Sequence, residues 1–265
     1  MRRDLRGLRI LITGASSGIG RCLAEQAAAR GAFVALAARS ADKLQELAEQ
    51  LTERGARAVA IPADVTSEAD REHLLESVAL HFGGLDVLIN NAGVASFGHF
   101  ATSSEEILRH VMEVNFFAPA ELMRQAVPLL VNGQRPAIVN VASMCGRRGL
   151  PAWTEYSASK FALSGLTEAL RGEFARFDID VLLVLPGLTK SDLPRHLLRN
   201  EGRMKIDFAK GLPPESVAAG ILRALERNRA ETVLGGEARW LLRVNRFFPR
   251  LVDRLTARKV RRLYA

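Results

Sequence analysis

Short apolar runs alternate with longer amphipathic stretches along most of the chain. The runs are apolar on both faces, as in buried strands, whereas the longer stretches carry their apolar residues at helical spacing. The expected strands are Arg9–Thr13, Phe33–Ala38, Arg57–Ile61, Asp86–Asn90, Ala137–Ala142, Asp180–Leu185 and Glu231–Leu234. The expected helices cover about Gly18–Arg30, Asp42–Arg54, Glu68–Phe82, Ser104–Leu130, Thr154–Phe177 and Pro214–Asn228. This alternation predicts an α/β fold in which helices cover both faces of a parallel sheet.

No linker, repeat or low-complexity segment interrupts the pattern, and 265 residues are within the range of one α/β domain. We therefore predict a single domain over residues 1–236 and a helical C-terminal extension over residues 237–265. Residues 191–212, before the last expected helix, show no clear periodicity. A loop of this length in a compact domain is typical of an active-site lid or a binding loop.

The formal net charge of +8 is concentrated at the C-terminus. From residue 238 onward there are nine basic residues and one acid, so the rest of the chain carries 28 basic and 28 acidic residues. The nine are Arg239, Arg243, Arg246, Arg250, Arg254, Arg258, Lys259, Arg261 and Arg262. A domain that is itself neutral argues against a nucleic-acid-binding fold, and the charged tail indicates a local contact surface.

Apolar residues recur between these arginines on a helical period, and Pro249 is suitably placed to begin a second helix. The apolar positions are Trp240, Val244, Phe247, Leu251 and Leu255. This pattern predicts a basic amphipathic hairpin of two helices. Three alternatives exist for its apolar stripe: it packs on its own domain, it packs on a partner subunit, or it lies on an anionic membrane.

The basic start of the chain is not followed by an apolar signal-peptide core, and no run approaches the roughly 18 apolar residues of a membrane span. The two cysteines, Cys22 and Cys145, fall in different expected elements and show no metal-ligand spacing. We therefore expect a cytoplasmic protein with reduced cysteines and no metal site. Peripheral membrane association is expected only if the third alternative for the tail holds.

A glycine-rich turn follows the first expected strand and opens the first helix. It reads Thr13-Gly14-Ala15-Ser16-Ser17-Gly18-Ile19-Gly20. Glycines let the backbone approach a pyrophosphate closely, and the N-terminus of the following helix supplies unpaired N–H groups and a partial positive charge. A plain strand-to-helix turn is the alternative, but the position directly after the first strand favours a dinucleotide site.

Arg39 lies where the second expected strand ends, in Ala37-Ala38-Arg39-Ser40. Cofactors with a free ribose 2′-hydroxyl usually meet an acidic side chain at this point, and an arginine can instead pair with a 2′-phosphate. Arg39 therefore favours NADP(H) over NAD(H), with a solvated arginine at a strand end as the alternative.

Tyr156 and Lys160 are four residues apart in an expected helix and therefore share one of its faces. A nearby ammonium favours phenolate over phenol and lowers the pKa of tyrosine from about 10. Such a tyrosine can exchange a proton with a substrate oxygen while hydride moves at the carbon. Ser143 closes the fifth strand, at the end that faces the ligand crevice. Its hydroxyl could hold the substrate oxygen beside Tyr156, and the alternative is a serine that only caps a helix.

In order and spacing these motifs resemble those of the short-chain dehydrogenase/reductase family over about residues 5–235. The family's glycine motif matches Thr13–Gly20, and its Asn-Asn-Ala-Gly matches residues 90–93. Its catalytic set matches Asn115, Ser143, Tyr156 and Lys160. Its adenine contact matches Asp64, and its nicotinamide-amide contact matches Thr189. The positions assigned to cofactor binding are Gly14, Ser16, Ser17, Gly18, Ile19, Gly20, Arg39, Asp64, Val65, Asn91, Ala92, Gly93, Tyr156, Lys160, Pro186, Gly187 and Thr189.

The resemblance implies a single-domain Rossmann-type doubly wound sheet of seven parallel strands, in a homodimer or homotetramer. It implies that Tyr156 is the acid/base and that Ser143 orients the carbonyl. Lys160 would hydrogen-bond the nicotinamide ribose and lower the pKa of the tyrosine. Asn115 would hold a water of the proton relay.

Three segments would line the substrate side of the site: Val94–Phe100, Met144–Trp153 and the 191–212 lid. Phe97, Met144, Trp153 and Leu193 favour an apolar carbonyl or secondary alcohol. The lid also contains residues that could meet an anionic headgroup or only face solvent, namely Arg195, His196, Arg199, Arg203, Lys205 and Lys210. The main prediction is an NADP(H)-dependent oxidoreductase, and the alternative is a non-catalytic nucleotide-sensing or scaffold protein on the same fold.

Overall fold

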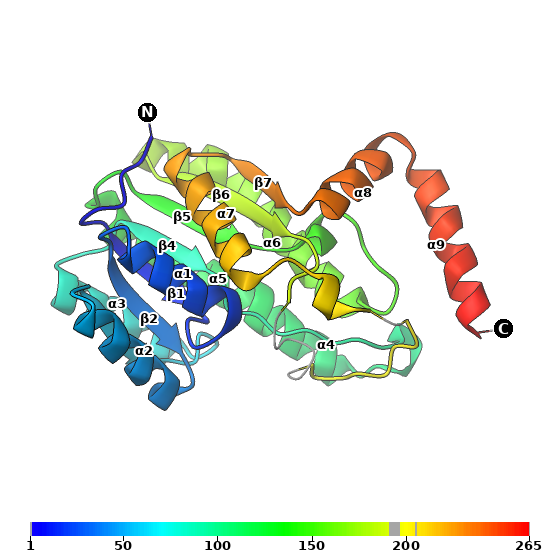
Figure 1. Ribbon diagram of the computed structural model, residues 1–265, viewed down its shortest axis with the longest axis horizontal. Helices are drawn as coiled ribbons and strands as arrows, with labels where there is room; N and C mark the ends of the chain where they lie inside the picture. Colours follow the sequence, from blue (N-terminus) through cyan, green and yellow to red (C-terminus); the bar gives the residue numbers. More distant parts are fainter. Residues whose placement is uncertain (1, 191–196, 205, 265) are drawn as a thin grey trace.

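The computed structural model describes residues 2–190, 197–204 and 206–264 (Figure 1). Its centre is a seven-stranded sheet in which every neighbouring pair of strands is parallel, in the order β3-β2-β1-β4-β5-β6-β7. The strands are β1 (Arg9–Thr13), β2 (Phe33–Ala38), β3 (Ala58–Pro62), β4 (Val87–Asn90), β5 (Ala137–Val141), β6 (Asp180–Pro186) and β7 (Glu231–Leu234). The strand order reverses between β1 and β4, so the ligand crevice is expected at the carboxyl ends of these strands.

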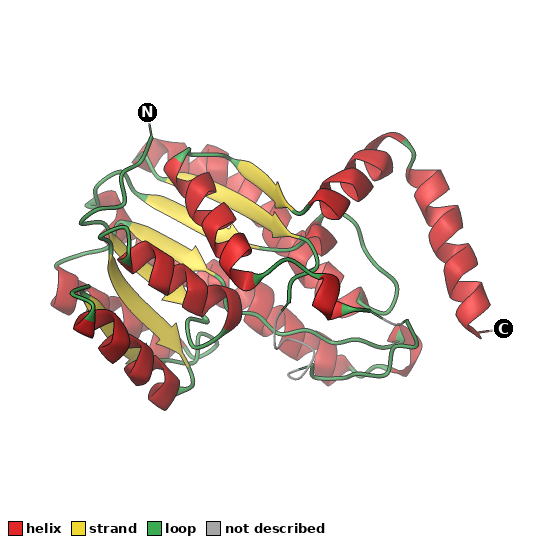
Figure 2. Cartoon of the chain, in the orientation of Figure 1, coloured by secondary structure: helices red, strands yellow, loops and turns green. Residues whose placement is uncertain are grey.

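Helices cover both faces of this sheet (Figure 2). One face packs against α1 (Gly18–Ala28), α2 (Ala41–Glu53) and α7 (Pro214–Glu226). The other face packs against α3 (Glu68–Phe82), α5 (Ala118–Val131) and α6 (Thr154–Glu173). Within β1, Ile10 and Ile12 belong to the first hydrophobic core and Leu11 to the second. The strands are mostly apolar, as expected of a sheet that is buried on both faces, and the predicted doubly wound fold is confirmed.

The helix expected over residues 104–130 is present, but it is not a regular α-helix throughout. The chain instead forms α4 (Glu105–Met112), one π-helical turn (Glu113–Phe117) and then α5. Side-chain hydrogen bonds from the middle of the π turn to a distant loop hold this irregularity, which residue periodicity alone does not reveal. The helix expected over residues 154–177 likewise ends its α-helical part at Glu173 and continues as a 3₁₀ turn, Phe174–Phe177.

Beyond β7 the chain forms α8 (Gly236–Phe247) and α9 (Pro249–Tyr264), and α9 projects from the body of the molecule (Figure 1). Pro249 is the first residue of α9, as the sequence predicts. Four of the five positions of the predicted stripe, Trp240, Phe247, Leu251 and Leu255, are exposed, which contradicts the alternative that the whole stripe packs on its own domain. Among the described residues, no helix is both long and apolar enough to cross a membrane.

Candidate active site

A cavity of about 1040 Å³ opens at the carboxyl ends of the central strands. Of the positions that the sequence assigns to cofactor binding, all except Gly20 line it. Ser143, Tyr156 and Lys160 also line it, whereas Asn115 does not. The structure therefore brings together, around one cavity, residues that are spread over most of the chain.

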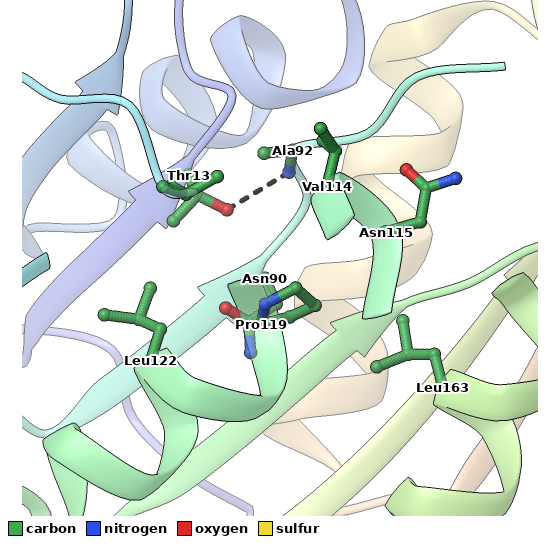
Figure 3. Close-up of a pocket in the computed structure, with 9 residues that line it drawn as sticks. Thr13, Asn90, Ala92, Val114, Asn115, Pro119, Leu122 and Leu163 are labelled. Atoms are coloured by element: carbon green, nitrogen blue, oxygen red, sulfur yellow. Dashed lines mark hydrogen bonds between the residues drawn. The ribbon is translucent and has the colours of Figure 1, made fainter. Parts of the chain in front are cut away.

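The glycine turn lies against the segment after β4. Gly14 has a φ of +67°, and a Cβ there would be 2.9 Å from the Cα of Ala92. A Cβ on Gly20 would be 2.0 Å from the carbonyl oxygen of Gly14, so Gly20 permits α1 to pack on the turn and does not itself line the cavity. The Thr13 hydroxyl accepts a hydrogen bond from the backbone N–H of Asn91 at 3.0 Å. It also accepts one from the N–H of Ala92 at 3.1 Å (Figure 3).

The charged end of the cavity lies beside β2. Arg39 is exposed there, and Lys43, in the first turn of α2, lines the same end of the cavity. Burial acts to raise the pKa of Asp64, but hydrogen bonds from Thr66 and the charge of Arg39 outweigh it and hold that pKa below its usual value. Sequence reasoning missed Lys43, although its spacing of four residues from Arg39 was a usable signal.

Ser143, Tyr156 and Lys160 converge next to the end of β5. The Nζ atom of Lys160 lies 5.8 Å from the centroid of the Tyr156 ring and donates a hydrogen bond to the carbonyl oxygen of Val141 at 3.2 Å. The Ser143 hydroxyl accepts a hydrogen bond from the N–H of Cys145 at 3.1 Å and interacts with the phenol of Tyr156. A hydroxyl, a phenol and an ammonium are thereby placed around one point of the cavity.

Burial dominates the electrostatics of these groups. It raises the pKa of Tyr156, and the hydrogen bond with Ser143 only partly opposes this effect. Burial also lowers the pKa of Lys160 to about 8, against a small opposing effect of Cys145. Desolvation thus disfavours the charged form of both side chains. The net shift of the Tyr156 pKa is upward, whereas the sequence predicted that Lys160 would lower it.

Asn115 is fully buried in the π turn between α4 and α5. Its Nδ2 atom donates to the Val94 carbonyl oxygen at 2.8 Å and to the Ser159 hydroxyl at 3.0 Å, and its Oδ1 atom accepts from the Val94 N–H at 2.9 Å. A cavity of about 10 Å³, the size of a single water, lies beside it and is also lined by Thr13 and Asn90 (Figure 3). The side chain thus ties the π turn to the loop after β4.

The substrate side of the main cavity is apolar and aromatic. The Trp153 ring lies 5.7 Å from the Tyr156 ring, 5.1 Å from the Phe97 ring and 6.5 Å from the Phe208 ring, measured between centroids. The apolar lining residues on this side include Met144, Leu150, Trp153, Leu197, Met204, Ile206 and Phe208. Phe97 packs behind Trp153 and does not line the cavity. The predicted lining residue Leu193, and the basic residues Arg195, His196 and Lys205, lie outside the described residues.

Two loops of the substrate side are joined by backbone pairing. The N–H of Phe97 donates to the carbonyl oxygen of Arg199 at 2.9 Å, and the N–H of Leu198 donates to that of Ala95 at 3.0 Å. The Arg199 guanidinium donates to the His99 carbonyl oxygen at 2.9 Å and pairs with Glu201. Arg199 therefore holds the two loops together and is not directed at a substrate headgroup.

One wall of the cavity comes from the C-terminal hairpin. Thr256 and Lys259 of α9 line it, together with Glu237 of α8. Sequence reasoning missed these residues, because no local pattern shows that the hairpin returns to the site. Its attachment includes Arg148, whose guanidinium donates to Asn245 of α8 at 3.1 Å and pairs with Asp253 of α9 at 2.6 Å.

A doubly wound sheet with a cavity at its switch point is typical of proteins that bind a dinucleotide. The chain belongs to the short-chain dehydrogenase/reductase family, whose model, described as short chain dehydrogenase, matches residues 9–202. The predicted family membership is thereby confirmed.

Named relatives and solved structures agree with this assignment. The chain is 35% identical to an uncharacterized oxidoreductase, YxnA, of Bacillus subtilis over 96% of its own length and 72% of the relative's. It is similar to a short chain dehydrogenase/reductase from Burkholderia phymatum in complex with NAD, with a TM-score of 0.85 and 26% identity over 94% of this chain and 96% of that one. It is also similar to a short chain dehydrogenase from Burkholderia cenocepacia in complex with NADP, with a TM-score of 0.78 and 30% identity over 89% and 100%.

Proposed function

We propose that this protein transfers hydride between NADP(H) and an apolar ketone or the corresponding secondary alcohol. The observation that carries the proposal is the convergence of Ser143, Tyr156 and Lys160 beside one cavity that also has an apolar wall. Ser143 and Tyr156 would hold the substrate oxygen, and Trp153 would pack against the apolar body of the substrate. The nicotinamide cofactor, when bound, supplies or accepts the hydride and, in its oxidised form, contributes a positive charge.

The protonation states favour carbonyl reduction. Because burial raises the pKa of Tyr156, its phenol is protonated at neutral pH and can donate a proton to the carbonyl oxygen. Alcohol oxidation instead needs the phenolate, so it should require higher pH or additional positive potential beside the ring. Lys160, with a pKa of about 8, can exchange a proton near neutral pH.

Asn115 has a supporting part in this proposal. Both N–H donors of its amide are already used by Val94 and Ser159. A relay water at this residue would therefore have to donate a hydrogen bond to it, through the remaining acceptor capacity of the amide or the backbone carbonyl. The small cavity beside Asn115 is of suitable size for one such water.

Two cations support the choice of NADP(H). Arg39 and Lys43 line the end of the cavity nearest β2, where a ribose 2′-phosphate would lie. Charge-assisted hydrogen bonds to a phosphate are stronger than bonds between neutral groups, so two cations would discriminate well against NAD(H). The similar structures include both an NAD and an NADP complex, so the preference rests on these two side chains.

The exposed face of α6 supports a homodimer or homotetramer. Ala158, Phe161 and Gly165 are exposed on this helix, and Phe117 is exposed on the neighbouring π turn. Small residues beside exposed aromatic ones permit close packing of a second helix pair. We place the protein in the cytoplasm, where the buried and unpaired Cys22 and Cys145 would remain reduced.

A panel of ketones and alcohols, assayed with NADPH, NADH and their oxidised forms, tests the proposal. We expect NADPH-dependent reduction of apolar ketones, with much slower turnover with NADH. Faster turnover with NADH would contradict the cofactor assignment. Tight NADPH binding without turnover of any member of the panel would instead favour the nucleotide-sensing alternative.

A further inference from the structure

Exposed apolar side chains gather on the C-terminal hairpin. Trp240 and Phe247 are 67% and 71% exposed, and Phe248, Leu251 and Leu255 are also exposed. Elsewhere in the described chain, exposed large apolar residues are spread over several different elements. Moving five such side chains out of water would stabilise the state in which they are buried. The hairpin is therefore an unpartnered apolar surface.

The same hairpin is strongly basic. All nine basic residues from Arg239 to Arg262 are exposed. Within the described part of the chain, none of them forms an ion pair with a carboxylate. The acid of this segment, Asp253, is already paired with Arg148 of the catalytic domain. The hairpin thus presents unneutralised positive charge together with apolar surface.

The two helices orient this surface away from the domain. Trp240 and Phe247 are seven residues apart, so they lie on one side of α8, roughly opposite the buried Ala238. In α9, Val252 is buried, whereas Leu251 and Leu255 on the neighbouring strip are exposed. Each helix therefore has one side attached to the protein and another apolar side open to solvent.

The attached side of α9 belongs to the active site. Thr256 and Lys259 line the cavity that also contains Tyr156 and Trp153. A partner that covered the exposed side of the hairpin would therefore lie next to the apolar substrate wall. Arg148 strengthens this connection, because it joins both helices to the segment between Ser143 and Tyr156.

We propose that the α8–α9 hairpin docks on an anionic lipid bilayer and places the substrate side of the cavity against it, so that the enzyme takes ketones dissolved in the membrane. A bilayer offers both an apolar layer for the aromatic side chains and anionic headgroups for the arginines. A second copy of the same surface would bring like charges together, which disfavours self-association. The docking itself does not depend on the proposed function, whereas the substrate class rests on it.

Vesicle flotation of the full chain tests the docking. We expect binding to vesicles of phosphatidylcholine and phosphatidylglycerol, weak binding to phosphatidylcholine alone, and loss of binding at high salt. The double substitution Trp240→Ser and Phe247→Ser should abolish flotation. Replacing Arg243, Arg250 and Arg254 by Gln should weaken the partition constant by about fivefold for each arginine.

Matched variants elsewhere provide the control. Leu80→Ser removes an apolar side chain that is 84% exposed on α3, and Arg54→Gln with Arg227→Gln removes exposed charge outside the tail. These variants should float like the wild type. If all variants float equally well, or the wild type does not float, the docking surface is wrong. If the double substitution leaves flotation unchanged and alters only the oligomeric state in solution, the hairpin joins copies of the chain and the proposal is overturned.

Kinetics separate substrate delivery from docking. A long-chain ketone dissolved in anionic vesicles and a short water-soluble ketone are compared with NADPH. The Trp240→Ser, Phe247→Ser variant should keep kcat/KM for the soluble ketone and lose at least tenfold in rate on the vesicle-bound ketone. Equal rates of variant and wild type on the vesicle-bound ketone would overturn the delivery step. Absence of turnover of both ketones by the wild type would refute the proposed function while leaving the flotation result intact.

Discussion

The two sides of the cavity are built in different ways. On the cofactor side, Gly14, Arg39 and Asn91 directly follow the ends of the parallel strands β1, β2 and β4, so the register of the sheet fixes their positions. On the substrate side, the wall comes from loops and from α9, and contacts between distant segments hold it in place. The first kind of construction depends on the ends of individual strands, whereas the second can change without disturbing the sheet. The comparison predicts that substitutions on the two sides affect different steps.

The largest effect should come from Tyr156, where the two sides meet. Tyr156→Phe removes the transferable proton and keeps the aromatic ring, so turnover should fall by about 10²–10⁴-fold. Steady-state reduction of any accepted ketone measures this loss. NADPH affinity and the melting temperature should stay near the wild-type values, because the ring still packs against Trp153. Full activity in this variant would remove the tyrosine from the mechanism.

On the cofactor side alone, Arg39→Ala should weaken NADPH binding about tenfold or more, from the loss of roughly 1.5–3 kcal/mol in a charge-assisted hydrogen bond. NADH affinity should be nearly unchanged, because NADH has no 2′-phosphate. Lys43→Ala should act in the same direction. Fluorescence titration with both cofactors measures the ratio, and an equal loss of NADPH and NADH affinity would count against a 2′-phosphate site.

Lys160 should make the free energy of unfolding depend on pH. Its pKa is about 8 in the folded chain and 10.5 ordinarily, so the unfolded chain binds more protons between these values and stability rises with pH, by up to about 1.4 kcal/mol per pH unit. Burial raises the thiol pKa of Cys145 above 9.0 and also raises the pKa of Tyr156, so these groups lower stability as pH rises further. The clearest interval is therefore pH 8 to 9.

Urea unfolding of wild type and Lys160→Met across that interval measures the contribution of the lysine. The wild-type free energy of unfolding should rise with pH relative to that of the variant. Parallel curves would mean that Lys160 is not desolvated as its burial indicates.

The smallest predicted effect concerns the substrate side. Arg199→Gln removes hydrogen bonds that join the lid segment to the loop around His99. Each such bond contributes about 0.5–1.5 kcal/mol, so KM for the ketone should rise by roughly two- to tenfold. The dissociation constant of NADPH should not change. A change confined to cofactor affinity would contradict the separation of the two sides.

The same division explains what could be predicted from the sequence. The glycine turn, Arg39 and the Tyr156–Lys160 spacing have local signals, and the structure brings them to one cavity as expected. The role of Arg199 and the return of α9 to the site were not predicted, because they depend on contacts between segments far apart. Arg148 and Asp253, for example, are separated by 105 positions. The direction of the Tyr156 pKa shift was also missed, because burial is a property of the folded chain.

The π turn Glu113–Phe117 contains one residue more than an α-helical path would need. An added residue rotates everything that follows by about 100°, since an α-helix has 3.6 residues per turn. The core-facing residues of α5, such as Leu122 and Ala126, are therefore in phase with the sheet only because of this insertion. Deleting a single residue here would regularise the helix locally, but it would turn either Asn115 or the apolar side of α5 toward solvent. The length of this turn therefore determines both which side of α5 faces the sheet and where Asn115 lies.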